Sequence, residues 1–205
     1  MNSARGNKFY DFSNPLDPAY KSPAHAEAAP GTSTDADSWQ PPPAQRGDIA
    51  RALFYMTVRY TGDVPGEPLL LLTDATNTIA ANTNFMGRFT TLLQWHFADP
   101  VDAAEQRRND EVCWLYQTNR NPFVDHPEFV ASAFLPPLQI AAAGTNILLR
   151  WTANSAPTLQ PETTTDLAAA WTPLTNAPTL TSNTWTLPAP VTAPAPSRFY
   201  RLSLR

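Results

Sequence analysis

Apolar residues recur at helical spacing in three stretches of the chain. The first follows Gly47, where the run 48–60 has one side lined by Ile49, Ala52, Leu53, Met56 and Tyr60. The second covers 86–97, and the third covers 100–119. Spacings of three and four residues predict amphipathic helices. The first helix has a second apolar flank, formed by Ala50, Phe54 and Val58, which predicts that this helix is largely buried.

The third helix has a recognisable start. Asp99 can accept hydrogen bonds as an N-cap, Pro100 suits the first turn, and Asp102 would lie beside the positive end of the helix dipole. The helix should end near Asn119, because Pro122 disfavours helical backbone at the residue that precedes it. Its expected apolar stripe comprises Val101, Ala104, Arg108, Val112, Leu115 and Tyr116.

Short β-branched or aromatic segments dominate the last third of the chain. They cover 146–152, 171–174, 184–187 and 198–204 and are separated by Pro, Asn, Ser and Thr. This pattern predicts a small antiparallel β-sandwich. We therefore expect two domains, at 1–135 and 136–205, with a long loop over 8–45 and a strand or buried turn at 69–72.

Composition narrows the class of protein. With 22 Pro, 7 Gly and 42% hydrophobic residues, the chain can close a core, and it contains no apolar run long enough to span a membrane. Residues 1–136 hold ten Lys and Arg against sixteen Asp and Glu, whereas 137–205 hold four against two. Binding of nucleic acid by the first part would need local arginines and a metal ion.

Several single residues have side chains that could be reactive, and each could instead be structural. The only cysteine, Cys113, lies within the third helix and is interpreted as an inert thiol. His96 shares a face with apolar residues, which indicates a core histidine, and His126 is interpreted as structural. The first helix also carries a polar stripe, which consists of Asp48, Arg51, Tyr55 and Arg59.

That polar stripe allows two interpretations. Asp48 and Arg51 can form an internal row of salt bridges, or Arg51 and Arg59 can point toward a substrate phosphate. The loop 119–123, which contains Arg120, is similarly either a cap and turn or a segment that presents amide and guanidinium groups to phosphates.

Several segments together resemble one family of nucleases. They read NSARGN (2–7), WQPP (39–42), RGDIARA (46–52), WHFADPVDAAEQRRND (95–110) and NRNPFVDHPEFV (119–130). In this order they resemble the bacterial endonuclease I family over about residues 1–131. The resemblance implies an α+β chain, in which the mainly helical distal part of a ββα-metal (His-Me finger) nuclease is followed by the β-sandwich module.

The resemblance also implies a chemistry. It implies a secreted or periplasmic, monomeric endonuclease that uses Mg²⁺ or another divalent cation to cut DNA, and often RNA, with little sequence preference. The metal would be held by the side-chain oxygen of Asn2, which suits a hard cation. Arg5, Arg51 and Arg120 would contact the nucleic acid substrate.

The family's Glu-His pair, which supplies an acidic ligand and the general base, does not occur in this sequence. Met1 stands where the family tends to carry valine, and a GTG valine codon can be misread as a start. We therefore expect a truncated gene model or gene, with the signal peptide and base encoded upstream, and little cleavage by these 205 residues. The alternative is a non-catalytic extracellular binding protein that uses the β module.

Overall fold

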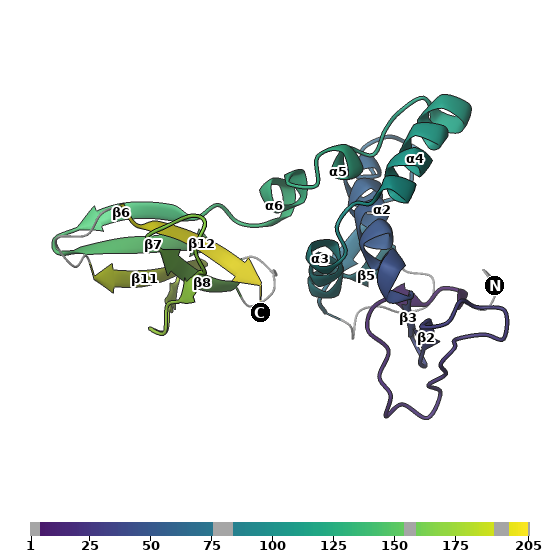
Figure 1. The fold of residues 1–205 in the computed structure, drawn as a ribbon, viewed down its shortest axis with the longest axis horizontal. Helices are drawn as coiled ribbons and strands as arrows, with labels where there is room; N and C mark the ends of the chain where they lie inside the picture. The colour runs from purple at the N-terminus through teal and green to yellow at the C-terminus, as the bar shows by residue number, and fades with distance from the viewer. Residues whose placement is uncertain (1–4, 76–83, 154–158, 191–196, 205) are drawn as a thin grey trace. The chain divides into compact units, whose positions relative to one another are not determined.

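The computed structural model describes residues 5–75, 84–153, 159–190 and 197–204. The chain divides into two compact units, Met1–Ala131 and Ser132–Arg205, which Figure 1 colours from purple to green and from green to yellow. The first unit combines a small sheet with helices, and the second is built from strands. The predicted α+β class is confirmed.

The first unit contains a small mixed sheet. Its strands, in spatial order, are β2 (Ser33–Thr34), β3 (Ser38–Gln40), β1 (Phe9–Tyr10), β5 (Phe85–Arg88) and β4 (Leu71–Thr73). β2 and β3 are antiparallel, and the other neighbours are parallel. β1 and β5 approach so closely that a Cβ at Gly87 would lie 3.0 Å from the Tyr10 carbonyl oxygen. This approach explains why glycine stands there.

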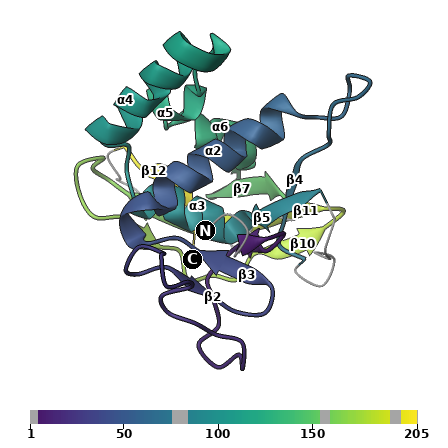
Figure 2. The ribbon, with the colours of Figure 1, turned by 90° about the vertical axis from the view of Figure 1, so that its right-hand side faces the viewer.

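Helices and loops accompany this sheet. The described helices are the 3-10 helix η1 (Pro43–Gln45), α2 (Arg46–Arg59), α3 (Phe89–Ala98), α4 (Ala103–Val112), the π-helix η3 (Cys113–Gln117), α5 (Pro122–Asp125) and α6 (Phe129–Phe134), of which the last crosses the boundary between the two units. Figure 2 shows α2 running between α3 and α4. The helix predicted over 48–60 is confirmed, although its exposed positions make it half-buried rather than largely buried.

The core of the first unit centres on Phe54. Its fully buried ring makes edge contacts with Phe89 and His96 of α3 and with Phe123 of α5, at centroid distances of 6.3, 6.2 and 6.3 Å. The other buried apolar side chains of α2, α3, α5 and α6 are Ala50, Leu92, Leu93, Trp95, Val124 and Val130. Aromatic pairs of this kind add to the free energy of simple apolar burial. Phe54 therefore joins three helices at one point.

Two helix starts differ from the prediction. The helix expected over 86–97 begins at Phe89, because the preceding residues pair with β1 and β4. The next helix begins at Ala103 rather than Pro100, and its N-cap is Asp102, whose carboxylate accepts hydrogen bonds from Ala104 N and Glu105 N, both at 2.8 Å. The Asp99 carboxylate instead accepts a hydrogen bond from Gly47 N at the start of α2.

The expected apolar stripe on α4 is wrong. The buried residues of this helix are Glu105 and Asn109, which are polar, whereas Leu115 and Tyr116 of the following η3 are exposed. Residues four apart share a helix face, so α4 faces its neighbours with hydrogen-bonding groups. The helix is held by a polar network rather than by apolar packing alone.

The second unit consists of two antiparallel sheets. One orders β10 (Thr179–Thr181), β11 (Thr184–Pro190), β7 (Asn146–Thr152) and β6 (Gln139–Ala143). The other orders β12 (Phe199–Leu204), β8 (Leu159–Thr164) and β9 (Thr172–Pro173). Buried Leu149, Trp151 and Leu187 pack against Leu159 and Leu202 from the other sheet. The predicted β-sandwich is confirmed.

Among the described residues, none of the helices has both the length and the apolar character needed to cross a membrane.

The buried leucines should carry the stability of the second unit. Leu149→Ala removes a side chain with no exposed surface and should destabilise strand β7 by about 2–5 kcal/mol, because the cavity refills only partly. Hydrogen exchange of β7 and β11 amides, read by mass spectrometry, measures this change. Leu180→Ala, at a 52% exposed position, is the control and should stay within about 0.5 kcal/mol. Equal effects of the two substitutions would contradict the assigned core.

Candidate functional site

Asn2, the predicted metal ligand, lies outside the described residues. The segment that follows it is described from Arg5 onward. The Arg5 guanidinium donates a hydrogen bond to the Lys8 carbonyl oxygen at 2.9 Å and lies 5.2 Å from the centre of the Tyr10 ring. Arg5 is half-buried and stabilises the turn that leads into β1.

Lys8 fixes the same segment to the loop between β2 and β3. Its ammonium group donates to Thr34 Oγ1 at 2.9 Å and to the Asp35 carbonyl oxygen, and Phe9 N donates to the Asp37 carbonyl oxygen at 3.1 Å. The Asp35 carboxylate in turn accepts hydrogen bonds from Asn14 N at 2.7 Å and Ser38 N at 2.7 Å. The segment at Lys8 and Phe9 is thus hydrogen-bonded to the loop between β2 and β3.

A second charged cluster lies where β1 ends. The Asp11 carboxylate accepts a hydrogen bond from the Thr91 hydroxyl and lies 3.6 Å from Arg88, which lies 3.7 Å from Asp74. Burial raises the pKa of Asp11 above its ordinary value, although Thr91 and Arg88 oppose the shift. Sequence reasoning missed Lys8, Asp11 and Arg88. Lys8 had a signal in its closeness to Arg5, whereas the Asp11–Arg88 contact joins positions far apart in the chain.

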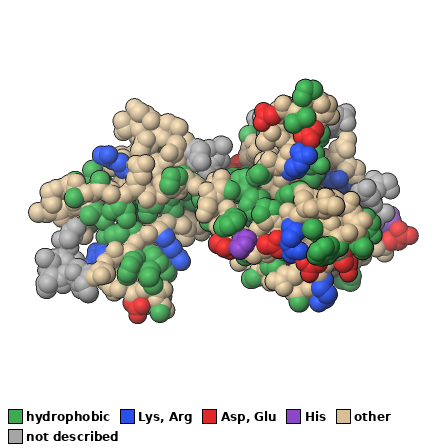
Figure 3. All heavy atoms as spheres, turned by 90° about the horizontal axis from the view of Figure 1, so that it is seen from above, with side chains coloured by type: hydrophobic (Ala, Val, Ile, Leu, Met, Phe, Trp, Pro, Cys, Tyr) green, Lys and Arg blue, Asp and Glu red, His purple; other side chains and the backbone are tan. Residues whose placement is uncertain are grey.

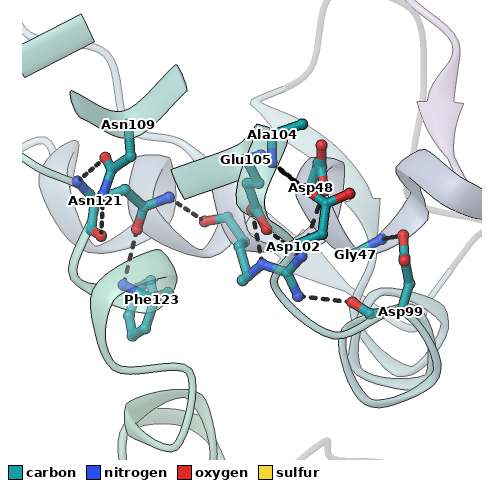
Figure 4. A network of polar contacts seen from close by, with 10 residues as sticks. Gly47, Asp48, Asp99, Asp102, Ala104, Glu105, Asn109, Asn121 and Phe123 are labelled. Atoms are coloured by element: carbon teal, nitrogen blue, oxygen red, sulfur yellow. Dashed lines mark hydrogen bonds and ion pairs between the residues drawn. The ribbon is translucent and has the colours of Figure 1, made fainter. Parts of the chain in front are cut away.

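Arg51 belongs to a buried polar network, and Figure 4 labels its partners Asp48, Asp99 and Glu105. Its guanidinium has no exposed surface and donates to Glu105 Oε1 at 2.7 Å and Glu105 Oε2 at 2.5 Å, and to the Asp99 carbonyl oxygen at 2.9 Å. A longer contact, of 3.4 Å, reaches Asp48. This geometry corresponds to the salt-bridge alternative. The assignment of Arg51 to substrate binding is corrected, because a fully buried and paired guanidinium cannot reach a phosphate in this structure.

The network continues through the start of α2. Gly47 N donates to Asp99 Oδ2 at 2.8 Å, and a Cβ at Gly47 would lie only 2.0 Å from the Asp99 carbonyl oxygen and 2.8 Å from an Arg51 nitrogen. No real side chain tolerates the first of these distances. Glycine is therefore required where the end of α3 crosses the start of α2.

The loop 119–123 closes the other side of the network. Asn121 is the N-cap of α5: its side-chain oxygen accepts from Phe123 N at 2.9 Å, and its amide nitrogen donates to the Arg51 carbonyl oxygen at 3.0 Å. Asn109 of α4 accepts from Asn121 N at 2.9 Å and donates to Asp125 at 3.1 Å. These contacts support the cap-and-turn interpretation of the loop.

Arg120 stands at the surface of this loop. Its guanidinium donates to both carboxylate oxygens of Asp125, at 2.8 and 2.7 Å, and forms a further ion pair with Asp110. These hydrogen bonds hold the pKa of Asp125 below its ordinary value. The side chain is 39% exposed, so the predicted phosphate contact would have to compete with two carboxylates.

The histidines have structural surroundings. His96 is 5% exposed among Phe54 and Phe97, and burial lowers its pKa to about 4. It is therefore neutral at neutral pH, as expected for a core histidine. His126 stacks on Phe129 at 4.8 Å and contacts Glu128 at 3.2 Å. Asp125 is engaged by Arg120 and Asn109 instead.

Charge on the first unit is mixed. Figure 3 shows acidic and basic side chains interspersed on the face that it presents. Within the described ranges, His, Cys, Asp and Glu side chains form no group of three or more that could hold a metal ion. The hydrogen bonds and ion pairs described above connect elements of the first unit, and the predicted metal ligand, Asn2, lies outside the described ranges.

Comparison with known proteins points to one family. The family model for endonuclease I matches residues 1–128. Two curated relatives, the extracellular ribonucleases of Bacillus amyloliquefaciens and Bacillus subtilis (strain 168), are each 46% identical over 129 residues. The match covers 63% of this chain but 40% and 41% of those proteins, so the chain spans about two fifths of their length. No solved structure matches the chain.

Replacing the buried Arg51 and replacing the exposed Arg120 should have very different effects on the stability of the first unit. Arg51→Met leaves Glu105 buried without its partner and should lower the free energy of unfolding of the first unit by about 3–5 kcal/mol. Arg120→Met is the matched control and should have a much smaller effect, since its ion pairs are solvated. Urea denaturation followed by far-ultraviolet circular dichroism compares them. An Arg51→Met protein as stable as Arg120→Met would refute the structural role.

Asp48 should make folding stability depend on pH. Burial, together with the charge of Glu105, raises its pKa from 3.8 to about 6. A raised carboxyl pKa contributes stability that is present below pH 3.8 and is lost as pH rises through about 6. Asp48→Asn should therefore stabilise the protein by about 2 kcal/mol at neutral pH and by little at about pH 4.

Thermal or urea denaturation across this pH range tests the expectation for Asp48. His96 titrates with the opposite sign, because its lowered pKa makes stability fall as pH falls, but it is present in both proteins and cancels in the difference. A stability difference between wild type and Asp48→Asn that does not change with pH would show that Asp48 does not titrate in this way.

Proposed function

The chain belongs to the endonuclease I family, and we propose that it forms part of an extracellular, monomeric endonuclease that hydrolyses phosphodiester bonds of RNA and DNA with little sequence preference. The observation that carries this proposal is the 46% identity to extracellular ribonucleases over 129 residues, which accounts for almost all of the first unit. The β-sandwich unit lies outside the matched region.

Phosphodiester hydrolysis by this route needs a base that takes a proton from the attacking water, a divalent cation and a group that holds the phosphate. Bound Mg²⁺ or a similar ion would neutralise charge on the phosphate and leaving oxygen. We assign its ligand in this chain to the Asn2 side-chain oxygen, a donor that hard cations accept. The general base and an acidic ligand are assigned to a Glu-His pair that these 205 residues do not contain.

The described residues that follow Asn2 in the sequence support this role. Arg5 and Lys8 donate to main-chain carbonyl oxygens, which fixes the backbone from Arg5 into β1. A guanidinium has five N–H donors, so Arg5 can keep its bond to Lys8 O and also donate to a phosphate. Arg5 is therefore preferred as the substrate contact, with Arg120 as a peripheral one.

The assignment of Asn2 can be tested in a chimaera. The 205 residues would follow the part of the Bacillus subtilis relative that precedes its matched region, which should restore metal-dependent cleavage. Asn2→Ala should then reduce cleavage at least about 10-fold, because even residues behind a metal ligand contribute that much. Cleavage of labelled RNA and of plasmid DNA, with and without EDTA, is the measurement.

Two further proteins complete that test. Asn14→Ala removes another asparagine amide in the same unit, one that accepts a hydrogen bond from Leu16 N, and should leave cleavage unchanged. The 205-residue chain alone should cleave little with or without Mg²⁺. Full activity of the Asn2→Ala chimaera would overturn the proposed metal site, and rapid cleavage by the chain alone would overturn the assignment of the base to a Glu-His pair that these residues lack.

A further inference from the structure

The end of α4 exposes an unusual group of large side chains. The π-helix η3 places Trp114, Leu115 and Tyr116 at 81%, 68% and 81% exposure. Figures 1 and 2 show this stretch as the continuation of α4. Tryptophan and tyrosine bury most of their surface in ordinary folded domains, so strong exposure of both within three residues indicates a binding surface.

This surface is held in place by the chain that follows it. Thr118 ends η3 with a left-handed backbone, φ +57°, and its N–H donates to the Cys113 carbonyl oxygen at 3.0 Å. The Asn119 amide then donates to the hydroxyl of Tyr55 on α2. The exposed rings therefore project from an anchored turn, which lowers the conformational entropy that a ligand would have to remove.

Two arginines without ion-pair partners lie on the same helix. Arg107 and Arg108 are exposed, and within the part of the chain that the structure describes neither has a carboxylate at salt-bridge distance. Arg107 acts only at longer range, on Asp102. By contrast, Arg51, Arg59, Arg88 and Arg120 all pair with carboxylates.

Both arginines lie within about two helical turns of the tryptophan. Seven residues separate Arg107 from Trp114, which is about 10 Å along a helix axis. Glu111 lies between them in the sequence and reduces the net charge of this stretch, whereas Arg107 and Arg108 contribute two cations that have no carboxylate at salt-bridge distance in the described part of the chain. We name the set Arg107, Arg108, Trp114 and Tyr116 the α4 platform.

We infer that the α4 platform binds unpaired strands of nucleic acid, with bases stacked on the rings and phosphates contacted by the guanidinium groups. This inference rests on the proposed nuclease function and names the state of the substrate. Every base has a π-face, so stacking accepts any sequence, whereas a duplex hides those faces. A contact between two copies centred here would bring unpaired arginines of both copies together, so an anionic partner is favoured.

Fluorescence anisotropy of labelled oligouridylate and oligothymidylate, in EDTA so that nothing is cleaved, tests the inference on the 205-residue protein. Trp114→Ala should weaken binding of both strands about 10-fold, and Trp114→Phe should restore most of it, because a phenyl ring still stacks. A hairpin duplex should bind more weakly than either strand. Trp114 is so exposed that folding should not change, which circular dichroism checks.

The arginines have a matched control. Arg107→Gln with Arg108→Gln should lower the slope of log affinity against log salt by about 1–2, since each phosphate contact releases counterions. Arg59→Gln, at an exposed arginine that pairs with Glu67, should leave that slope unchanged.

Three results would overturn the inference: equal binding by Trp114→Ala and wild type, tighter binding of the hairpin, or self-association in sedimentation that Trp114→Ala abolishes while oligonucleotides do not bind. The last result would assign the surface to a second copy. None of these bears on cleavage by the chimaera, so failure here is distinguishable from failure of the proposed function.

Discussion

The buried ion pair between Arg51 and Glu105 is the interaction on which the first unit depends. It joins α2 to α4, and through the Asp99 carbonyl oxygen it also fixes the end of α3. A guanidinium removed from water costs several kcal/mol unless nearly all its donors are satisfied. The structure meets that requirement with both oxygens of one carboxylate and a main-chain carbonyl. The position and orientation of α4 follow from this geometry, since its own buried residues are polar.

The consequences of that pair extend in two directions. Toward the start of α2, the close crossing at Gly47 allows Asp99 to bond the helix amide, and it crowds Asp48 against Glu105, which contributes to the raised pKa of Asp48. Toward α5, the carbonyl of Arg51 accepts a hydrogen bond from Asn121, which caps that helix. Residues that look like a row of substrate-binding groups in the sequence therefore build a scaffold. The parts of the first unit to which we propose a functional role are the segment from Arg5 to β1 and the end of α4.

This division explains which site residues could be found beforehand. Asn2 and Arg5 are assigned by resemblance to a nuclease motif and stay predictions, whereas the family itself is shown by a match over residues 1–128. Arg51 and Arg120 carry the same charge and occur in similarly polar surroundings in the sequence, yet one is fully buried and the other is 39% exposed. Burial depends on Glu105 and Asp125 arriving from elsewhere in the chain, and no local pattern reports that.

Local patterns were enough to predict the helix after Gly47, the strands of the sandwich such as β7 at Asn146–Thr152, the core character of His96 and the family. These features rest on periodicity or on contiguous motifs. Contacts between distant parts of the chain were needed to show that Asp102 rather than Asp99 caps α4, that α4 docks through Glu105 and Asn109, and that Trp114 faces solvent. A hydrogen-bond acceptor can serve one helix end or another, and the choice depends on which donors are brought to it by residues distant in the chain.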